Sequence, residues 1–376
     1  MSDKYTETVT TSYGGNVKKA FGGLIAGLIL FIASFFVLWI NEGSNAHQIK
    51  LINYINDTVV VVSSESIDKV NDNKLIALSA SAAVQNELSD GIISIKDALV
   101  LDRTVEMYQW KENKETETTK KVGGGTTEKT TYSYSKQWSE QEINSEDFKK
   151  TGYVNPQFTV KSKRLNALSG SLGAFKLSET QTKKIGNLKE LTSLPENANY
   201  EIIDEFYYKG NDYANPQVGD VRISYSYVPS GAEISVIGKQ MPDGGIEPMI
   251  SDNGTIYIQY GGNLTKDEMI AKFKKQNSIK TWVFRFFGWL LMFFGLSLII
   301  NPLVVVASFI PFLSEIIGFA SSAVLFVISV ILSIITIGVA WLAYRPLMAV
   351  LMFAAAAVLV VLAKGLISKV KNKKSE

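Results

Sequence analysis

The sequence lacks cysteine altogether and has a single histidine, His47, among 376 residues. The lack of cysteine excludes disulfide scaffolds, thiolate zinc sites, iron–sulfur clusters and cysteine nucleophiles. A single histidine excludes most polyhistidine metal sites and leaves one possible base for a serine hydrolase triad. Net charge is also small, because 38 basic residues balance 36 acidic residues to give +2. A nucleic-acid binder that works by bulk positive charge is therefore excluded.

Long apolar runs are abundant at both ends of the chain. Residues 20–40 carry no charge, and a helix of this length crosses a hydrocarbon core of about 30 Å. Residues 286–363 carry only two charges. Proline ends or kinks a helix, so Pro302 and Pro311 should interrupt this second run near its start.

These runs predict a membrane protein with four transmembrane α-helices, one N-terminal and three C-terminal, and a large inserted β-rich α+β extracytoplasmic domain. The predicted segments are a cytoplasmic N-terminal segment (1–19), transmembrane helices at 20–40, 282–300, 317–344 and 346–366, the domain (41–281), an interfacial or re-entrant segment (301–316) and a basic cytoplasmic tail (367–376).

The lysines predict the orientation, because cytoplasmic flanks of membrane helices are enriched in lysine and arginine. Lys18 and Lys19 precede the first span, and five lysines follow residue 363 at the end of the last span. Four spans place both termini on the same side. Both termini are therefore expected in the cytoplasm, and the domain in a periplasm, outside the cell or in an organelle lumen.

Alternating apolar and polar residues predict strands in the domain. The expected strands are Thr58–Val62, Leu75–Ala80, Thr104–Trp110, Thr131–Trp138, Asp220–Tyr227, Glu233–Gly238 and Thr255–Tyr260. The third and fourth should form a hairpin with a mobile tip around Gly123–Gly125. A helix is expected over Ser178–Leu194. Another is expected over Thr265–Asn277, opened by a capping box and lying either on the domain or on the membrane surface.

Catalytic motifs are weak in the domain. Gly123–Lys129 lacks the spacing of a phosphate-binding loop. Several carboxylates could supply a catalytic pair, but they carry no paired motif and are expected as surface or sheet-rim charges: Asp102, Glu106, Asp204, Glu205 and Asp220. No metal-ligand cluster is apparent, and we expect no catalytic residues, no cofactor and no enzymatic activity.

Charges beside the spans give a sharper prediction, because charge within a membrane is costly and usually paired. Glu42, Arg285 and Arg345 all fall at the outer boundary of the predicted helices. We expect Glu42 to pair with one of the two arginines and to lock the bundle; the alternative is that the arginines extend to lipid phosphates. Glu315 falls on the cytoplasmic side near Lys364, as an interfacial anchor or a salt-bridge partner.

Small and aromatic residues add two expectations for the helices. Gly23 and Gly27 form a small-xxx-small face that suits close helix packing, within one chain or between copies. An aromatic belt at the membrane interface is expected from Trp282, Trp289, Trp341 and Tyr344.

Several long strings together resemble the transmembrane protein 43 family, also called LUMA. They are Trp39–Gly43, Arg103–Trp110, Tyr132–Tyr134, Trp138, Ile143–Ser145, Gly219–Tyr227, Lys280–Trp282, Gly288-Trp289 and Trp341–Pro346. The resemblance implies four spans, a large lumenal domain, and self-association in the endoplasmic reticulum and inner nuclear membrane, where animal members help to organise the nuclear envelope with lamins and emerin. The glycine-rich tip, the lysine-rich tail and the missing cysteine depart from those members and favour a bacterial one, without nuclear partners.

The expected function is therefore that of a non-enzymatic, multi-pass membrane protein that self-associates and organises or scaffolds a membrane. One alternative is an oligomeric ion or lipid conduit, or a lipid-handling protein, with Arg285, Arg345 and Glu315 along the path. Another is a membrane-bound lipid or cell-wall enzyme. The expected partners are the lipid bilayer, further copies of the chain and an unidentified membrane or extracytoplasmic protein. The expected location is a bacterial inner membrane or, in a eukaryote, the endoplasmic reticulum or inner nuclear membrane.

Overall fold

The computed structural model describes residues 4–307, 311–347 and 349–350, without the side chains of residues 311–321. The chain divides into two compact units. The sheet unit comprises Met1–Val9, Leu51–Glu117 and Glu128–Phe273, and the helix unit comprises Thr10–Lys50, Thr118–Thr127 and Lys274–Glu376.

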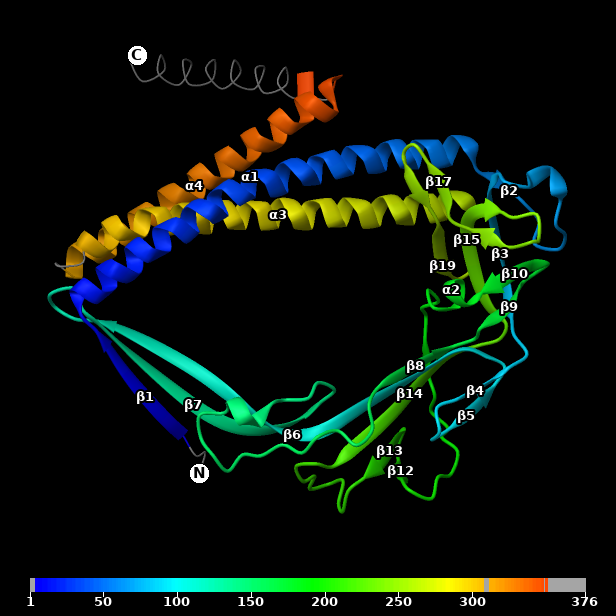
Figure 1. The fold of residues 1–376 in the computed structure, drawn as a ribbon, viewed down its shortest axis with the longest axis horizontal. Coiled ribbons are helices and arrows are strands. Elements are labelled where there is room, and N and C mark those ends of the chain that lie inside the picture. Colours follow the sequence, from blue (N-terminus) through cyan, green and yellow to red (C-terminus); the bar gives the residue numbers. More distant parts are fainter. Residues whose placement is uncertain (1–3, 308–310, 348, 351–376) are drawn as a thin grey trace, which may run out of the picture. The chain divides into compact units, whose positions relative to one another are not determined.

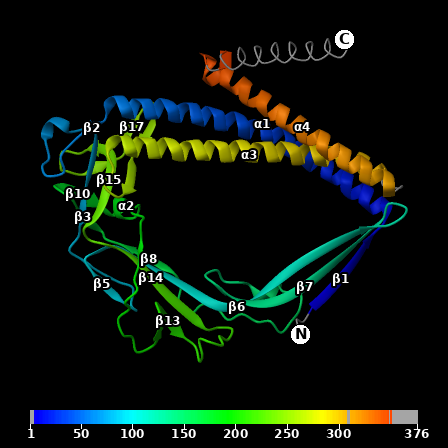
Figure 2. The ribbon, with the colours of Figure 1, turned by 180° about the vertical axis from the view of Figure 1, so that it is seen from behind.

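Three long helices supply the helix unit: α1 (Tyr13–Thr58), α3 (Lys266–Ala307) and α4 (Pro311–Tyr344). Within this unit α1 and α3 lie side by side (Figures 1 and 2). Among the described residues, three segments are long and apolar enough to cross a membrane: Tyr13–Thr58, Lys266–Ala307 and Ser322–Tyr344. The chain is thus a membrane protein with three candidate spans and a large sheet-rich part. The predicted fourth span, residues 346–366, lies almost entirely outside the described residues.

The helices extend beyond the predicted spans. The helix Thr265–Asn277 and the span 282–300 are one helix, α3, which continues through Pro302 to Ala307. The predicted break at Pro302 is therefore wrong, and residues 301–307 of the expected interfacial segment are helical. A membrane helix tolerates proline where neighbouring helices and side chains satisfy the backbone groups that it frees. At this end of α3, the Tyr13 hydroxyl donates to the carbonyl of Val306, at 3.1 Å.

Two large antiparallel sheets build most of the sheet unit. The first has the order β1 (Lys4–Thr11), β7 (Thr126–Ser139), β6 (Ala98–Lys120), β14 (Val221–Pro229), β13 (Phe206–Lys209) and β12 (Glu201–Ile203), with β11 (Lys189–Glu190) on β14 and β8 (Lys163–Asn166) on β6. The second has the order β10 (Phe175–Ser178), β9 (Ser169–Leu172), β3 (Leu75–Ala83), β15 (Ala232–Gln240) and β16 (Ile246–Glu247), with β19 (Ile258–Gly261) on β15 and β2 (Val60–Val61), its one parallel strand, on β3. Two small ribbons pair β4 (Glu87–Ser89) with β5 (Ser94–Lys96) and β17 (Met249–Ser251) with β18 (Gly254–Ile256).

Helix ends cover one region of the second sheet. Leu51 and Ile55 near the end of α1 and Met269 near the start of α3 pack with Ile237 of β15 and Ile258 of β19. The apolar stripe at the start of α3 therefore packs on the domain, one of the two expected placements.

The predicted capping box is present at the start of α3. The Thr265 amide donates to Glu268 Oε2 at 2.8 Å, and the Glu268 amide donates to Thr265 Oγ1 at 3.3 Å. These two bonds satisfy backbone donors at the start of the helix, where no intrahelical partner exists.

Some local predictions were wrong. The helix expected over Ser178–Leu194 is a single turn, α2 (Glu179–Thr182), and Asn187 beyond it has a φ of 60°, which a continuing helix cannot contain. The strand expected at Thr58–Val62 is the end of α1 followed by the two-residue β2. The strand expected at Thr255–Tyr260 is divided between β18 and β19.

The hairpin of β6 and β7 is far longer than its predicted strands. Most of the expected loop continues as strand, and the turn is confined to residues 121–125. A hydrogen bond links this turn to the start of α1: Asn16 Nδ2 donates to the carbonyl of Gly124 at 3.0 Å. A mobile tip was predicted because glycine and charge favour loops. The threonines of both strands favour a sheet instead.

Residues 4–11 form β1, which pairs with β7 at the edge of the first sheet (Figures 1 and 2). Paired strands exchange backbone hydrogen bonds, so they lie on the same side of a membrane. The prediction that residues 1–19 and residues 41–281 lie on opposite sides does not account for this pairing, and it stays a prediction. The lysine pattern alone could not reveal the pairing, because strand pairing between distant segments leaves no local charge signal.

A disulfide tests the pairing of β1 with β7 in a bilayer. Thr10 Oγ1 and Thr127 Oγ1 lie 3.4 Å apart, so cysteines at these positions should form a disulfide with little movement. In the T10C/T127C variant reconstituted in liposomes, we expect mild oxidation to remove most free thiols, as measured by maleimide labelling after denaturation.

The T116C/T130C variant is the matched control, because those two hydroxyl oxygens lie 3.2 Å apart across the β6–β7 hairpin itself. The chain has no native cysteine to interfere. If the control pair oxidises while T10C/T127C keeps both thiols, β1 is not paired with β7 in the membrane.

Candidate functional site

A buried charge cluster joins the three long helices inside the helix unit. The Glu42 side chain from α1 is fully buried. Its Oε1 accepts from Arg285 Nε at 2.6 Å and its Oε2 from Arg285 Nη2 at 2.9 Å, so the pair is bidentate. Trp341 Nε1 of α4 donates to the same Oε2 at 2.7 Å. One carboxylate thus binds α1 to both α3 and α4.

Small side chains let α1 and α3 approach closely enough for this contact. A Cβ built on Gly27 would lie 2.9 Å from the backbone oxygen of Gly295, and one on Gly295 would lie 2.6 Å from the amide nitrogen of Phe31. Gly23 has only an ordinary contact, 3.6 Å, with Leu298. The predicted small-residue face therefore packs within one chain, and Gly27 is its critical position.

Polar contacts continue this interface toward the sheet-unit end of α1. Asn41 Nδ2 donates to the carbonyl of Thr281 at 3.2 Å, and Asn277 Nδ2 donates to Asn45 Oδ1 at 3.2 Å. On the α4 side, Gly43 lies against the ring of Tyr344, where a Cβ would meet the ring at 2.8 Å. The strings Trp39–Gly43, Lys280–Trp282 and Trp341–Pro346, which carry part of the family resemblance, meet at this cluster.

Arg345 does not join the ion pair. It lies within electrostatic range of Glu42 and Arg285, but its Nη2 is buried without a hydrogen-bond partner among the described residues. Of the two pairings that were open from the sequence, the structure contains the one between Glu42 and Arg285. Glu315 lies in α4, and its side chain falls outside the described residues.

The aromatic residues predicted for the interface have different contacts. Trp282 is exposed and stacks under Arg285, whose guanidinium carbon lies 4.8 Å from the ring centroid. Tyr344 packs on Trp39, with ring centroids 5.7 Å apart. Trp289 instead donates to Ser329 Oγ of α4 at 3.0 Å, about 10 Å further along α3 than Trp282. The interface belt itself stays a prediction.

Sequence reasoning missed the contributions of three residues to the helix contacts. It placed Trp341 only in the belt, although its indole is a donor to Glu42. It did not single out Gly288 and Gly295, which face Leu38 and Phe31 of α1. Their spacing of seven residues places them on one side of α3, and this signal could have been found.

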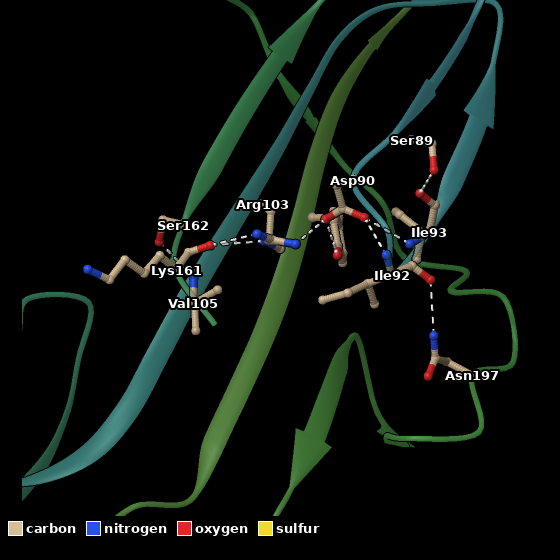
Figure 3. A network of polar contacts seen from close by, with 10 residues as sticks. Ser89, Asp90, Ile92, Ile93, Arg103, Val105, Lys161, Ser162 and Asn197 are labelled. Carbon is tan, nitrogen blue, oxygen red and sulfur yellow. Dashed lines mark hydrogen bonds and ion pairs between the residues drawn. The ribbon is translucent and has the colours of Figure 1, made fainter. Parts of the chain in front are cut away.

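A second buried carboxylate lies in the sheet unit (Figure 3). Asp90 accepts from Arg103 Nη1 and from the Tyr225 hydroxyl, each at 2.7 Å. The amides of Ile92 and Ile93 donate to its other oxygen, each at 2.9 Å. Burial raises the pKa of Asp90, but these four hydrogen bonds and the positive charge outweigh it and lower the pKa below its usual value.

Three of the acidic residues considered as a catalytic pair each have a partner of their own. Asp102 pairs with Arg164 at 3.3 Å, Glu106 with Arg222 at 2.6 Å, and Asp220 accepts from the Tyr208 hydroxyl at 2.6 Å. Among the described residues, no group of three or more histidine, cysteine, aspartate or glutamate side chains could hold a metal ion.

Removing the charge of Glu42 should destabilise the helix unit, because Arg285 would keep a buried charge without a carboxylate. We expect Glu42→Gln to lower the free energy of unfolding by about 3–5 kcal/mol. Thermal unfolding in detergent measures this, with Glu179→Gln as the control, since Glu179 forms an exposed pair with Lys183. If Glu42→Gln melts at a temperature as high as that of the control, the ion pair between Glu42 and Arg285 does not stabilise the helix unit.

Asp90 should make stability depend on pH. Because its pKa is lowered in the folded state, its contribution is complete above the unfolded pKa of about 3.9 and is lost as the pH falls through the folded value. Asp90→Asn should therefore be destabilising at pH 7, and its difference from the wild type should shrink below about pH 4.

Denaturant unfolding at several pH values checks this expectation. Asp243→Asn is the control, because Asp243 forms an exposed ion pair with Lys176, which should contribute little. A constant difference between the wild type and Asp90→Asn from pH 7 to pH 3 would show that the charge of Asp90 is not what stabilises the fold.

Comparison with known proteins gives one consistent family. Residues 107–346 match the family model described as Transmembrane protein 43. Transmembrane protein 43 of Rattus norvegicus is 30% identical over 392 residues, covering 99% of this chain and 96% of that protein. The Homo sapiens protein of that name is 29% identical over 99% of this chain and 97% of its own length, and a Drosophila melanogaster homolog is 30% identical over 70% and 72%. No solved structure matches the chain. The chain therefore belongs to the transmembrane protein 43 family.

Proposed function

We propose that this protein is a non-enzymatic membrane protein that self-associates and organises the bilayer around it. The observation that carries the proposal is the free outer edge of β1. This strand ends the first sheet, pairs only with β7 among the described residues, and is exposed along nearly its whole length. An uncovered edge strand presents unpaired backbone donors and acceptors that a second chain can use.

The composition of β1 supports this use of its edge. Lys4–Thr11 contains four threonines, a tyrosine and a valine, which favour extended backbone, two charged residues, Lys4 and Glu7, and no proline. Edges that must stay unpaired usually carry protective devices such as proline, bulges or inward-pointing charge. Tyr5 and Val9 are exposed, so side chains as well as backbone are available to a partner.

The state of the buried carboxylates supports a structural role. Glu42 and Asp90 are each saturated by donors from the protein itself, in fixed geometry. A general acid or base needs access to substrate. Neither group has that environment, which supports a scaffold over a membrane-bound lipid or cell-wall enzyme.

The alternative of a conduit finds less support. Both hydrogen bonds of Arg285 in this cluster go to Glu42. The contact between α3 and α4 is filled by three buried residues, Met292, Ser329 and Ser333. A path for ions would therefore need surfaces contributed by other copies.

Mass measurement in a lipid nanodisc tests the proposal. We expect the wild type to form a defined oligomer of the 41.5 kDa chain, and the variant T6K/T8K, which adds two charges to β1, to shift it toward smaller species. The control T192K/S193K adds the same charge at exposed loop positions of the same unit. A wild-type monomer, or an equal shift in both variants, would contradict self-association through β1.

A further inference from the structure

Arg345 has an unsatisfied hydrogen-bonding group in the helix unit. Its Nη2 is buried, and none of the described residues accepts from it. A buried charged donor without an acceptor is strongly unfavourable, and arginine keeps its proton under all ordinary conditions. The position therefore calls for an acceptor other than the described residues.

The charge balance of the cluster indicates the sign of that acceptor. Glu42 supplies one negative charge, and Arg285 already holds both of its oxygens. Arg345 leaves the cluster with one excess positive charge. An anion would neutralise it, and the planar guanidinium matches the oxygens of a phosphate better than a lysine would.

An apolar groove lies beside the cluster on the same helices. It has a volume of about 440 Å³ and is lined by Phe35, Phe36 and Trp39 of α1 and by Ile335, Thr336 and Val339 of α4. Its walls are almost entirely apolar. Trp39 at its end packs on Tyr344, the residue before Arg345.

The spacing suits one amphipathic ligand. Val339 and Arg345 are six residues apart, which is about 9 Å along a helix. A phospholipid places its phosphate and the upper part of its acyl chains at a comparable separation, at the level where the apolar part of a membrane helix ends. Basic positions between membrane helices are typical binding sites for anionic headgroups.

We propose that an anionic phospholipid binds here, with its phosphate accepting from the Arg345 guanidinium and one acyl chain lying in the groove between α1 and α4. The lipid completes the charge cluster that joins the three helices. This site is independent of self-association through β1, because β1 contributes nothing to it.

Native mass spectrometry tests the proposal on the full-length chain. Delipidated protein in detergent is mixed with equal amounts of dioleoylphosphatidylglycerol and dioleoylphosphatidylcholine. We expect the wild type to retain the anionic lipid preferentially, and Arg345→Gln to lower that retention about tenfold, the equivalent of one charge-assisted hydrogen bond. Lys280→Gln is the matched control, because it removes one exposed positive charge near the same level of α3.

A second variant tests the groove without changing any charge. Val339→Trp fills it and should also reduce retention of the anionic lipid, so the test stands even if Arg345→Gln fails to fold. Equal losses in Arg345→Gln and Lys280→Gln would overturn the proposal, as would equal retention of the two lipids by the wild type. Displacement of the lipid by millimolar inorganic phosphate, with no effect of Val339→Trp, would instead indicate a site for free phosphate and would also overturn it.

Discussion

The buried ion pair between Glu42 and Arg285 is the constraint on which the helix unit depends. Neither group is stable alone in apolar surroundings, so each fixes the position of the other. The bidentate geometry sets the rotation of α1 and α3, and the bond from Trp341 to the same carboxylate adds α4. Apolar packing between membrane helices is not directional, whereas this cluster specifies one arrangement.

The cluster and the glycine contacts act together. Gly27 and Gly295 bring the backbones of α1 and α3 close, at a distance that larger side chains would not permit. About 22 Å further along α1, Glu42 is then within reach of Arg285. Asn41 and Asn45 extend the contact by two hydrogen bonds to α3. Close approach therefore makes the ion pair possible, and the ion pair keeps the helices in register.

Charge and periodicity in the sequence predicted the features that are local. The apolar runs located three candidate spans, the capping box located the start of α3, and Glu42 stood out because charge at a membrane boundary is rare. The features that depend on distant segments were not predictable in this way. The pairing of β1 with β7 leaves no local signal, and Trp341 resembles any interfacial tryptophan until its indole is seen to donate to Glu42. The helix break predicted at Pro302 was wrong because the rule that proline ends or kinks a helix comes from soluble proteins, whereas α3 is a candidate membrane helix.

The place of β1 in the chain also determines the order in which the protein assembles. β1 is synthesised first, but β7 emerges more than a hundred residues later. At ordinary rates of translation this interval is on the order of ten seconds. During that time α1 has emerged and is available to the insertion machinery, while β1 has no partner. Docking of the first strand is thus a late step of biogenesis, and the sheet that contains it closes only after the whole hairpin has been made.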